Sequence, residues 1–186
     1  ILIANRGEIA LRVLRACREL DIKTVAIHSE ADESAMHVKM ADESFWVGSA
    51  SAQLSYLNIP AIVTAATLTN ADGIHPGYGF LSENKRFAEI IEEHEIKFIG
   101  PKSEHISMMG NKIAAKKIME ENKVPTVPGL NDLSDMKKVL EFIDKIKLPV
   151  IIKAASGGGG KGMRVVNKIE DLEESINAAK IESKKS

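Results

Sequence analysis

Short apolar runs alternate with longer amphipathic stretches over residues 1–100 of the chain. Five short runs predict strands, at residues 1–4, 24–28, 45–47, 73–75 and 97–99. Between them, apolar residues recur every three or four positions and predict helices, at residues 8–20, 34–40, 60–69 and 82–94. Regular alternation of strands with helices favours an α/β fold with a doubly wound, parallel, Rossmann-like sheet.

Two of these helices carry start signals. Pro60 lies in the first turn of one helix, where its missing N–H costs no hydrogen bond, so Asn58 or Ile59 is expected to cap it. Ser82 is expected to cap the next helix, and Glu83 would interact favourably with that helix's dipole.

The pattern changes after residue 100. Residues 103–121 are almost wholly helical in pattern, and residues 124–129 carry the prolines and glycine of a linker. A helix over residues 136–146, a strand at 150–153, a glycine-rich loop, a strand at 163–166 and a helix from residue 169 follow. We therefore predict an α/β domain at residues 1–100, a helical linker at 101–130 and a third part at 131–186, in which the last helix packs on a hairpin.

Composition narrows the class of protein. The 186 residues are 44% hydrophobic and 27% charged, which excludes disordered, collagen-like and disulfide-stapled classes. With 25 basic and 26 acidic residues the net charge is −1, which argues against nucleic-acid binding, and lysine pairs such as Lys116-Lys117 are expected to be solvated helix faces. One cysteine, no leader segment and no apolar run of about 20 residues indicate a cytoplasmic protein.

Cys17 falls on a predicted apolar helix face with Ile9, Val13 and Leu20, so we expect a buried structural thiol rather than a nucleophile. The chain opens inside an apolar run without an initiator methionine and closes without a helix stop signal. We therefore expect a fragment of a longer protein.

Five glycines fall within residues 157–162, between the two predicted strands of the hairpin. Backbone N–H groups without side chains form an anion cradle, and Lys153 and Lys161 flank it, so we expect phosphate binding rather than a flexible surface hairpin. The spacing differs from the Walker loop, because Gly162 follows the lysine where a hydroxyl is required. It also differs from the dinucleotide fingerprint, because a strand follows it instead of a helix.

Two loops follow predicted parallel strands at the edge where open α/β sheets bind ligands. Residues 5–8 (Asn-Arg-Gly-Glu) are most simply a tight turn in which Gly7 serves backbone geometry. Residues 75–84 contain too many glycines and aromatics for a simple connection and are expected to wall a ligand pocket. The five histidines lack zinc-ligand spacing, and no Ser-His-Asp arrangement can be assembled.

Five segments, at residues 5–10, 55–58, 75–84, 98–101 and 153–163, occur in an order and at intervals that together resemble the biotin carboxylase family. The resemblance covers essentially the whole chain. Residues 55–62 are most similar to the separate biotin carboxylase subunit of bacterial-type acetyl-CoA carboxylase. The α chains of pyruvate, propionyl-CoA and methylcrotonyl-CoA carboxylases share most of the other motifs.

The resemblance implies an ATP-grasp ligase in which ATP and bicarbonate give carboxyphosphate, whose CO₂ passes to biotin on a carrier protein. This is the first half-reaction of acetyl-CoA carboxylase, an enzyme of fatty acid synthesis. It also implies Mg²⁺, a biotin carboxyl carrier protein, carboxyltransferase subunits and a homodimer. Residues 1–100 would be the N-terminal domain, and residues 131–186 part of the ATP-grasp lid.

The resemblance also implies ATP-binding roles for six residues, Lys112, Ile151, Lys153, Gly159, Gly160 and Met163. The two lysines match the family's ATP-binding lysines, the two glycines match its phosphate-covering loop, and the two apolar residues would lie near the adenine. Tyr78 corresponds to a residue near the biotin site.

In the family, the magnesium-holding carboxylates, the base that deprotonates bicarbonate and the arginines near biotin lie beyond the position of Ser186. We therefore expect no catalytic or metal-binding residue in this chain and no bicarbonate-dependent ATP cleavage by it alone. Two alternatives stay open: another ATP-grasp ligase, such as a carbamoyl-phosphate synthase, and a non-catalytic module that binds nucleotide or a partner subunit.

Overall fold

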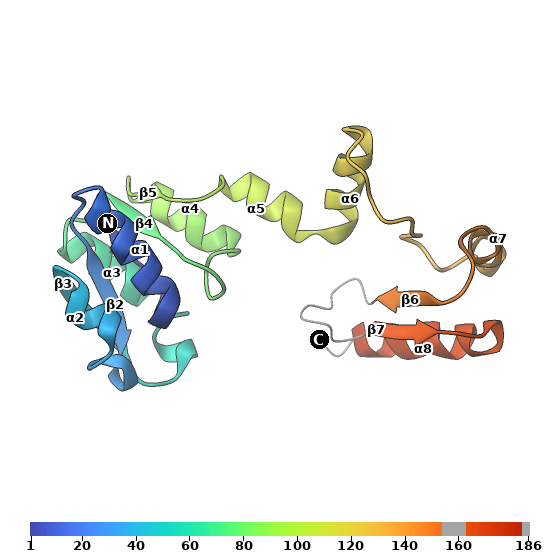
Figure 1. Ribbon diagram of the computed structural model, residues 1–186, viewed down its shortest axis with the longest axis horizontal. Coiled ribbons are helices and arrows are strands. Elements are labelled where there is room, and N and C mark those ends of the chain that lie inside the picture. Colours follow the sequence, from blue (N-terminus) through green and yellow to red (C-terminus); the bar gives the residue numbers. More distant parts are fainter. Residues whose placement is uncertain (154–162, 184–186) are drawn as a thin grey trace. The chain divides into compact units, whose positions relative to one another are not determined.

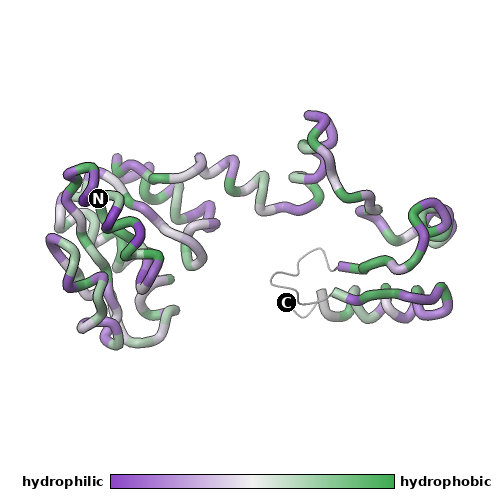
Figure 2. Tube along the Cα trace, in the orientation of Figure 1, coloured by the Kyte–Doolittle hydropathy of each residue, from purple (hydrophilic) through white to green (hydrophobic). Residues whose placement is uncertain are grey.

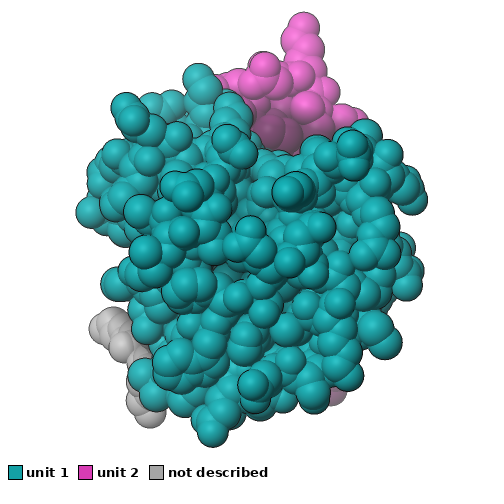
Figure 3. Space-filling view, turned by 90° about the vertical axis from the view of Figure 1, so that its left-hand side faces the viewer, with its two compact units in different colours: residues 1–110 teal, residues 111–186 magenta. Residues whose placement is uncertain are grey.

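The computed structural model describes residues 1–153 and 163–183. The chain divides into two compact units, residues 1–110 and residues 111–186, which Figure 3 colours separately. The predicted division into parts at 1–100, 101–130 and 131–186 stays a prediction. No helix in the described part of the chain is long and apolar enough to cross a membrane.

The first unit is built on a parallel sheet of five strands in the order β3-β2-β1-β4-β5. Figure 1 draws this part of the chain in blue to green. The strands are β1 (Leu2–Ile3), β2 (Val25–Ser29), β3 (Glu43–Gly48), β4 (Gly73–His75) and β5 (Lys97–Phe98). All five predicted strands are confirmed, with ends that differ by at most two residues, and so is the doubly wound fold class. The strand order reverses between β1 and β4, and this is the switch point at which such sheets bind ligands.

Helices cover both faces of this sheet because neighbouring side chains of β1 point in opposite directions. Leu2 packs in a core with α3 (Ile59–Leu68) and α4 (Lys85–Glu93), whereas Ile3 packs with α1 (Gly7–Glu19). Short elements complete this part, namely α2 (Met36–Met40) and two 3₁₀ turns at Glu30–Asp32 and Ala52–Leu54. Figure 2 shows apolar and polar residues alternating along the helices that cover the sheet. This alternation is the pattern from which these helices were predicted.

The helix caps confirm one prediction and correct another. Asn58 caps α3, since its side chain accepts a hydrogen bond from the N–H of Ala61 at 3.2 Å. Ser82 does not cap α4: the helix begins at Lys85, and the Asn84 side chain accepts from the N–H of Phe87 at 2.9 Å. Residues 79–84 form consecutive turns instead of a helical turn, which delays the start of the helix by three residues.

Cys17 is buried as predicted, but the predicted apolar face of α1 is only partly right. Ala10 and Leu14 are buried beside it, Ile9 and Val13 are half-buried, and Leu20 is exposed. The physical reason is that α1 ends at Glu19, so Leu20 lies at the C-cap outside the helical pattern.

The predicted continuous helix over residues 103–121 is two helices, α5 (Ser103–Gly110) and α6 (Lys112–Glu121). Asn111 separates them, because its side chain accepts from the N–H groups of Ile113 and Ala114 at 3.1 and 3.0 Å and so caps α6. The break coincides with the boundary between the two units.

The second unit confirms the predicted hairpin with a helix packed on it. It contains α7 (Met136–Ile146), the antiparallel strands β6 (Val150–Lys153) and β7 (Met163–Val166), a 3₁₀ turn (Ile169–Asp171) and α8 (Leu172–Ser183). Its core joins one face of the hairpin to α7 and α8, through Val139, Ile143, Ile152, Val166, Leu172, Ile176 and Ala179. None of the side chains on α6 is buried.

Candidate functional site

Asn5 joins the two loops that flank the switch point of the sheet. Its buried side chain donates to the carbonyl oxygens of Pro76 and Tyr78 at 2.9 and 2.8 Å, and its Oδ1 accepts from the N–H of Arg6 at 2.9 Å. Gly7 has φ +56°, which agrees with the predicted turn geometry. The tight-turn interpretation was therefore incomplete, because it missed the long-range role of Asn5.

The loop after β4 makes a strained turn at residues 77–80. Gly77 and Gly79 both have φ +66°, and Phe80 has φ +42°, a region that bulky residues rarely adopt. Tyr78 lies between the glycines with 77% of its surface exposed. The Phe80 ring stacks on Tyr56 at a centroid distance of 5.2 Å. The turn therefore presents Tyr78 to solvent from a backbone that is held on both sides.

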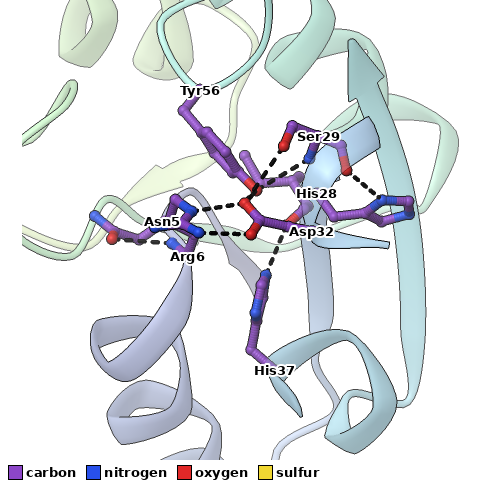
Figure 4. Close-up of polar contacts among 8 residues, drawn as sticks. Asn5, Arg6, His28, Ser29, Asp32, His37 and Tyr56 are labelled. Carbon is purple, nitrogen blue, oxygen red and sulfur yellow. Dashed lines mark hydrogen bonds and ion pairs between the residues drawn. The ribbon is translucent and has the colours of Figure 1, made fainter. Parts of the chain in front are cut away.

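Asp32 is the centre of a polar cluster at the same edge of the sheet (Figure 4). Arg6 donates to both of its carboxylate oxygens, and the Tyr56 hydroxyl donates to Oδ2 at 2.6 Å. The Ser29 N–H donates in turn to the Tyr56 hydroxyl at 3.0 Å. Sequence analysis missed Asp32, although its position just after β2, at the carboxyl end of a parallel strand, was a usable signal.

The pKa values of the cluster follow from these contacts. The hydrogen bonds from Arg6 hold the pKa of Asp32 well below its usual range, and the same contact raises the pKa of Arg6. Burial raises the pKa of Tyr56, and its hydrogen bond to Asp32 adds to that effect. Asp32 is therefore ionised and Tyr56 neutral at neutral pH, so the direction of this hydrogen bond is fixed.

We expect Asp32→Asn to destabilise the first unit by about 1.5–3 kcal/mol at pH 7, through loss of charged hydrogen bonds. The unfolded chain binds a proton at Asp32 as the pH falls below about 4, while the folded chain resists it because its pKa is lower. The contribution of Asp32 is thus complete above that pH and declines in acid. Urea unfolding, followed by the fluorescence of the single tryptophan, Trp46, should give a larger difference between wild type and variant at pH 7 than at pH 3. Equal differences in the free energy of unfolding at the two pH values would contradict the low pKa of Asp32 in the folded chain.

One face of the hairpin in the second unit is apolar and open. Ile151 pairs with Val165 and Lys153 with Met163 across the two strands, so all four share a face. The exposed fractions of Ile151, Met163 and Val165 are 56%, 49% and 59%, and Lys153 is exposed as well. Three exposed apolar side chains and one cation on the same face of the hairpin suit a ligand with an aromatic ring and an anionic group. Val165 was missed, although the two-residue alternation from Met163 points to it.

The structure brings three of the predicted site residues together, namely Ile151, Lys153 and Met163. Lys112 is the first residue of α6, exposed at the N-terminus of that helix, and Tyr78 belongs to the first unit. Gly159 and Gly160 lie outside the described residues. The roles of all seven stay predictions.

The prediction that Lys116 and Lys117 are both on a solvated helix face is wrong for Lys116. Its Nζ donates to the carbonyl oxygen of Gly129 at 3.0 Å, and only 19% of its side chain is exposed, because it ties the segment after α6 to that helix. The neighbouring Lys117 is 75% exposed, as expected of a solvated helix face.

Among residues 1–153 and 163–183, no three His, Cys, Asp or Glu side chains are placed to share a metal ion.

Comparison with known proteins matches a family model to each unit. Residues 1–106 match the biotin carboxylase N-terminal domain, and residues 111–186 match the ATP-binding domain of the carbamoyl-phosphate synthase L chain. The chain is 55% identical to the biotin carboxylase of Haemophilus influenzae over 99% of its length and 42% of that protein. It is 51% identical to the mitochondrial methylcrotonoyl-CoA carboxylase subunit alpha of Dictyostelium discoideum, over 98% of the chain and 26% of that protein.

A solved structure is similar over the whole chain. It is the biotin carboxylase domain dimer of the 2-oxoglutarate carboxylase of Hydrogenobacter thermophilus, in complex with MgADP, ADP and bicarbonate. The TM-score is 0.85 at 46% identity, over 100% of this chain and 41% of that one. The chain thus spans about two fifths of the curated biotin carboxylases that it matches.

Proposed function

The chain belongs to the biotin carboxylase family, and from this we propose that it forms the N-terminal part of an enzyme that uses ATP and bicarbonate to carboxylate biotin on a carrier protein. The observation that carries the proposal is the match of residues 1–106 to the biotin carboxylase N-terminal domain. The family model that matches residues 111–186 is described as a carbamoyl-phosphate synthase domain, so this match does not distinguish the two kinds of ligase. The match of the first unit does distinguish them, because its model is specific to biotin carboxylase.

The hairpin face supplies the nucleotide contacts in this proposal. Ile151, Met163 and Val165 offer an exposed apolar surface for the adenine ring, and Lys153 at the end of β6 offers a charge-assisted hydrogen bond to phosphate. Lys112 adds a second cation at the start of α6, where the helix dipole also favours an anion. Gly159 and Gly160 are proposed to cover the phosphates with backbone N–H donors.

Biotin binding and the exclusion of water are assigned to the complete carboxylase, the whole enzyme of which this chain would be the N-terminal part. Tyr78 is proposed to line the biotin pocket from the turn at residues 77–80. Mg²⁺ is proposed to bind together with ATP in the complete carboxylase. Reactive acyl phosphates survive only where water is excluded, which is the expected task of the hairpin and its loop.

The finer identity is also a proposal. The separate biotin carboxylase subunit of acetyl-CoA carboxylase is proposed on the resemblance of residues 55–62, because overall identity is similar for biotin carboxylases (52–55%) and for the propionyl-CoA and methylcrotonoyl-CoA carboxylase chains (52% and 51%). Its partners would then be a biotin carboxyl carrier protein and carboxyltransferase subunits, in the cytoplasm and in fatty acid synthesis. A homodimer is supported by the dimer reported for the Hydrogenobacter thermophilus domain.

The proposed activity is tested by ATP cleavage in the complete carboxylase. We expect phosphate release that requires bicarbonate and rises when free biotin is added. Cleavage that depends on ammonia or glutamine instead would indicate a carbamoyl-phosphate synthase, and nucleotide binding without cleavage would indicate a non-catalytic module. Either result would contradict the proposal.

A further inference from the structure

The turn at residues 77–80 is held by its neighbours rather than by its own conformational preference. Three of its four residues have positive φ, and for Phe80 this is costly because its side chain crowds the backbone. Such a conformation persists only where surrounding contacts impose it. Side chains from two other segments of the chain, Asn5 and Tyr56, provide those contacts.

Asn5 fixes the first half of the turn. Its amide nitrogen donates hydrogen bonds to the carbonyl oxygens of Pro76 and Tyr78, which are 71 and 73 residues away in the sequence. Both N–H groups of the amide are thereby used. The fit is close, because a Cβ placed on Gly77 would lie 2.6 Å from that nitrogen. Asn5 itself is 2% exposed and lies two residues after the end of β1, so it is a rigid support.

Tyr56 fixes the second half. Its ring stacks on Phe80 with an interplanar angle of 24°, and Tyr56 is itself 2% exposed. Its hydroxyl is anchored between the Asp32 carboxylate and the Ser29 N–H, and Arg6 holds Asp32 in turn. The cluster in Figure 4 therefore connects the ends of β1 and β2 to the Phe80 side of the turn.

Tyr78 depends on these two supports because most of its own side chain is free of packing. With 77% of its surface exposed, it takes its position from the backbone that carries it. We propose that Asn5 and Tyr56 are positioning residues, which clamp the turn from opposite ends and so hold Tyr78 in the orientation that the biotin pocket requires. The clamp is a property of this chain, whereas its benefit to biotin rests on the proposed function.

Amide hydrogen exchange of the complete carboxylase tests the clamp without any assay of activity. Tyr56→Leu removes the stacked ring, and Asn5→Asp removes both N–H donors at constant size. We expect exchange in residues 76–84 to be at least about tenfold faster in each variant. Tyr56→Phe keeps the ring and should give a smaller increase. Trp46→Leu, which removes an exposed aromatic ring from β3, should leave these amides unchanged.

Steady-state kinetics of the complete carboxylase test the benefit to biotin. Asn5→Asp and Tyr56→Leu should raise KM for free biotin or lower kcat at least about fivefold while KM for ATP stays within about twofold, since a misplaced turn costs transition-state contacts at one substrate only. Tyr56→Phe should recover most of the loss. A merely structural role would change both KM values together or lower the amount of folded enzyme alone.

The outcomes separate this inference from the proposed function. Unchanged exchange in residues 76–84 of folded Tyr56→Leu and Asn5→Asp chains would overturn the clamp, whatever the enzyme does. Faster exchange with equal changes in the two KM values would overturn its role at biotin. A wild-type enzyme without bicarbonate-dependent cleavage would refute the proposed function, and the exchange result would still decide whether the clamp exists.

Discussion

Lys153→Ala is expected to lower kcat/KM for ATP in the complete carboxylase by about 10- to 150-fold. The variant loses one charge-assisted hydrogen bond to phosphate, which is worth about 1.5–3 kcal/mol. Lys153 ends β6 on the hairpin face that also carries Ile151 and Met163, so a nucleotide seated on that face would bring its phosphates to this cation. Steady-state kinetics with ATP as the varied substrate measure the effect.

The control for this variant is Lys117→Ala, which removes an equal charge from a solvated helix face. We expect it to change kcat/KM for ATP by less than about twofold, because exposed ion pairs contribute little. Lys116→Ala is a poor control, since the structure ties that side chain to Gly129. Equal ATP kinetics for Lys153→Ala and wild type would refute the nucleotide assignment of the hairpin face.

Gly77→Ala is expected to destabilise the first unit by about 2–4 kcal/mol, through overpacking and a strained φ. The new Cβ would lie 2.6 Å from Nδ2 and 2.8 Å from Cγ of Asn5, and 2.8 Å from Cγ2 of Ile9. The Asn5 side chain is buried and hydrogen-bonded to the turn, so it has little room to move away. Urea unfolding followed by Trp46 fluorescence measures the loss.

Gly79→Ala distinguishes the effect of backbone strain from that of a steric clash with Asn5. Gly79 has the same φ of +66°, but a Cβ there would meet nothing within 4 Å. Only the left-handed backbone is then penalised, at about 1–2 kcal/mol. If the two alanine variants were equally stable, the close approach of Asn5 to Gly77 would not be a real constraint on the turn.

The sheet could be predicted from the sequence because its signal is local. Each strand is a short apolar run and each helix an amphipathic one, and their alternation indicates that the strands are parallel. The misplaced features depend on single polar side chains: Asn84 takes the cap expected of Ser82, and Asn111 breaks the helix expected over residues 103–121. Capping competes among neighbouring polar residues at nearly equal energy, so patterning does not select the winner.

In the candidate site, too, the residues with a local sequence signal were predicted and those joined by long-range contacts were not. Lys153, Ile151 and Met163 were named from the resemblance, and strand alternation explains why they share a face. The cluster at Asp32 was missed because its partners, Arg6 and Tyr56, lie 26 and 24 residues away in the sequence. Contacts of that kind follow from the strand order, which places the ends of β1 and β2 side by side, and not from any local motif.

The most direct test of the account follows the carbon of bicarbonate. The complete carboxylase is incubated with ATP, Mg²⁺, isotopically labelled bicarbonate and biotin, and label in carboxybiotin is counted against phosphate released. The account predicts labelled carboxybiotin that forms only when ATP is present and that falls in the Lys153→Ala variant but not in Lys117→Ala. ATP cleavage by the folded wild-type enzyme without label in biotin would contradict it.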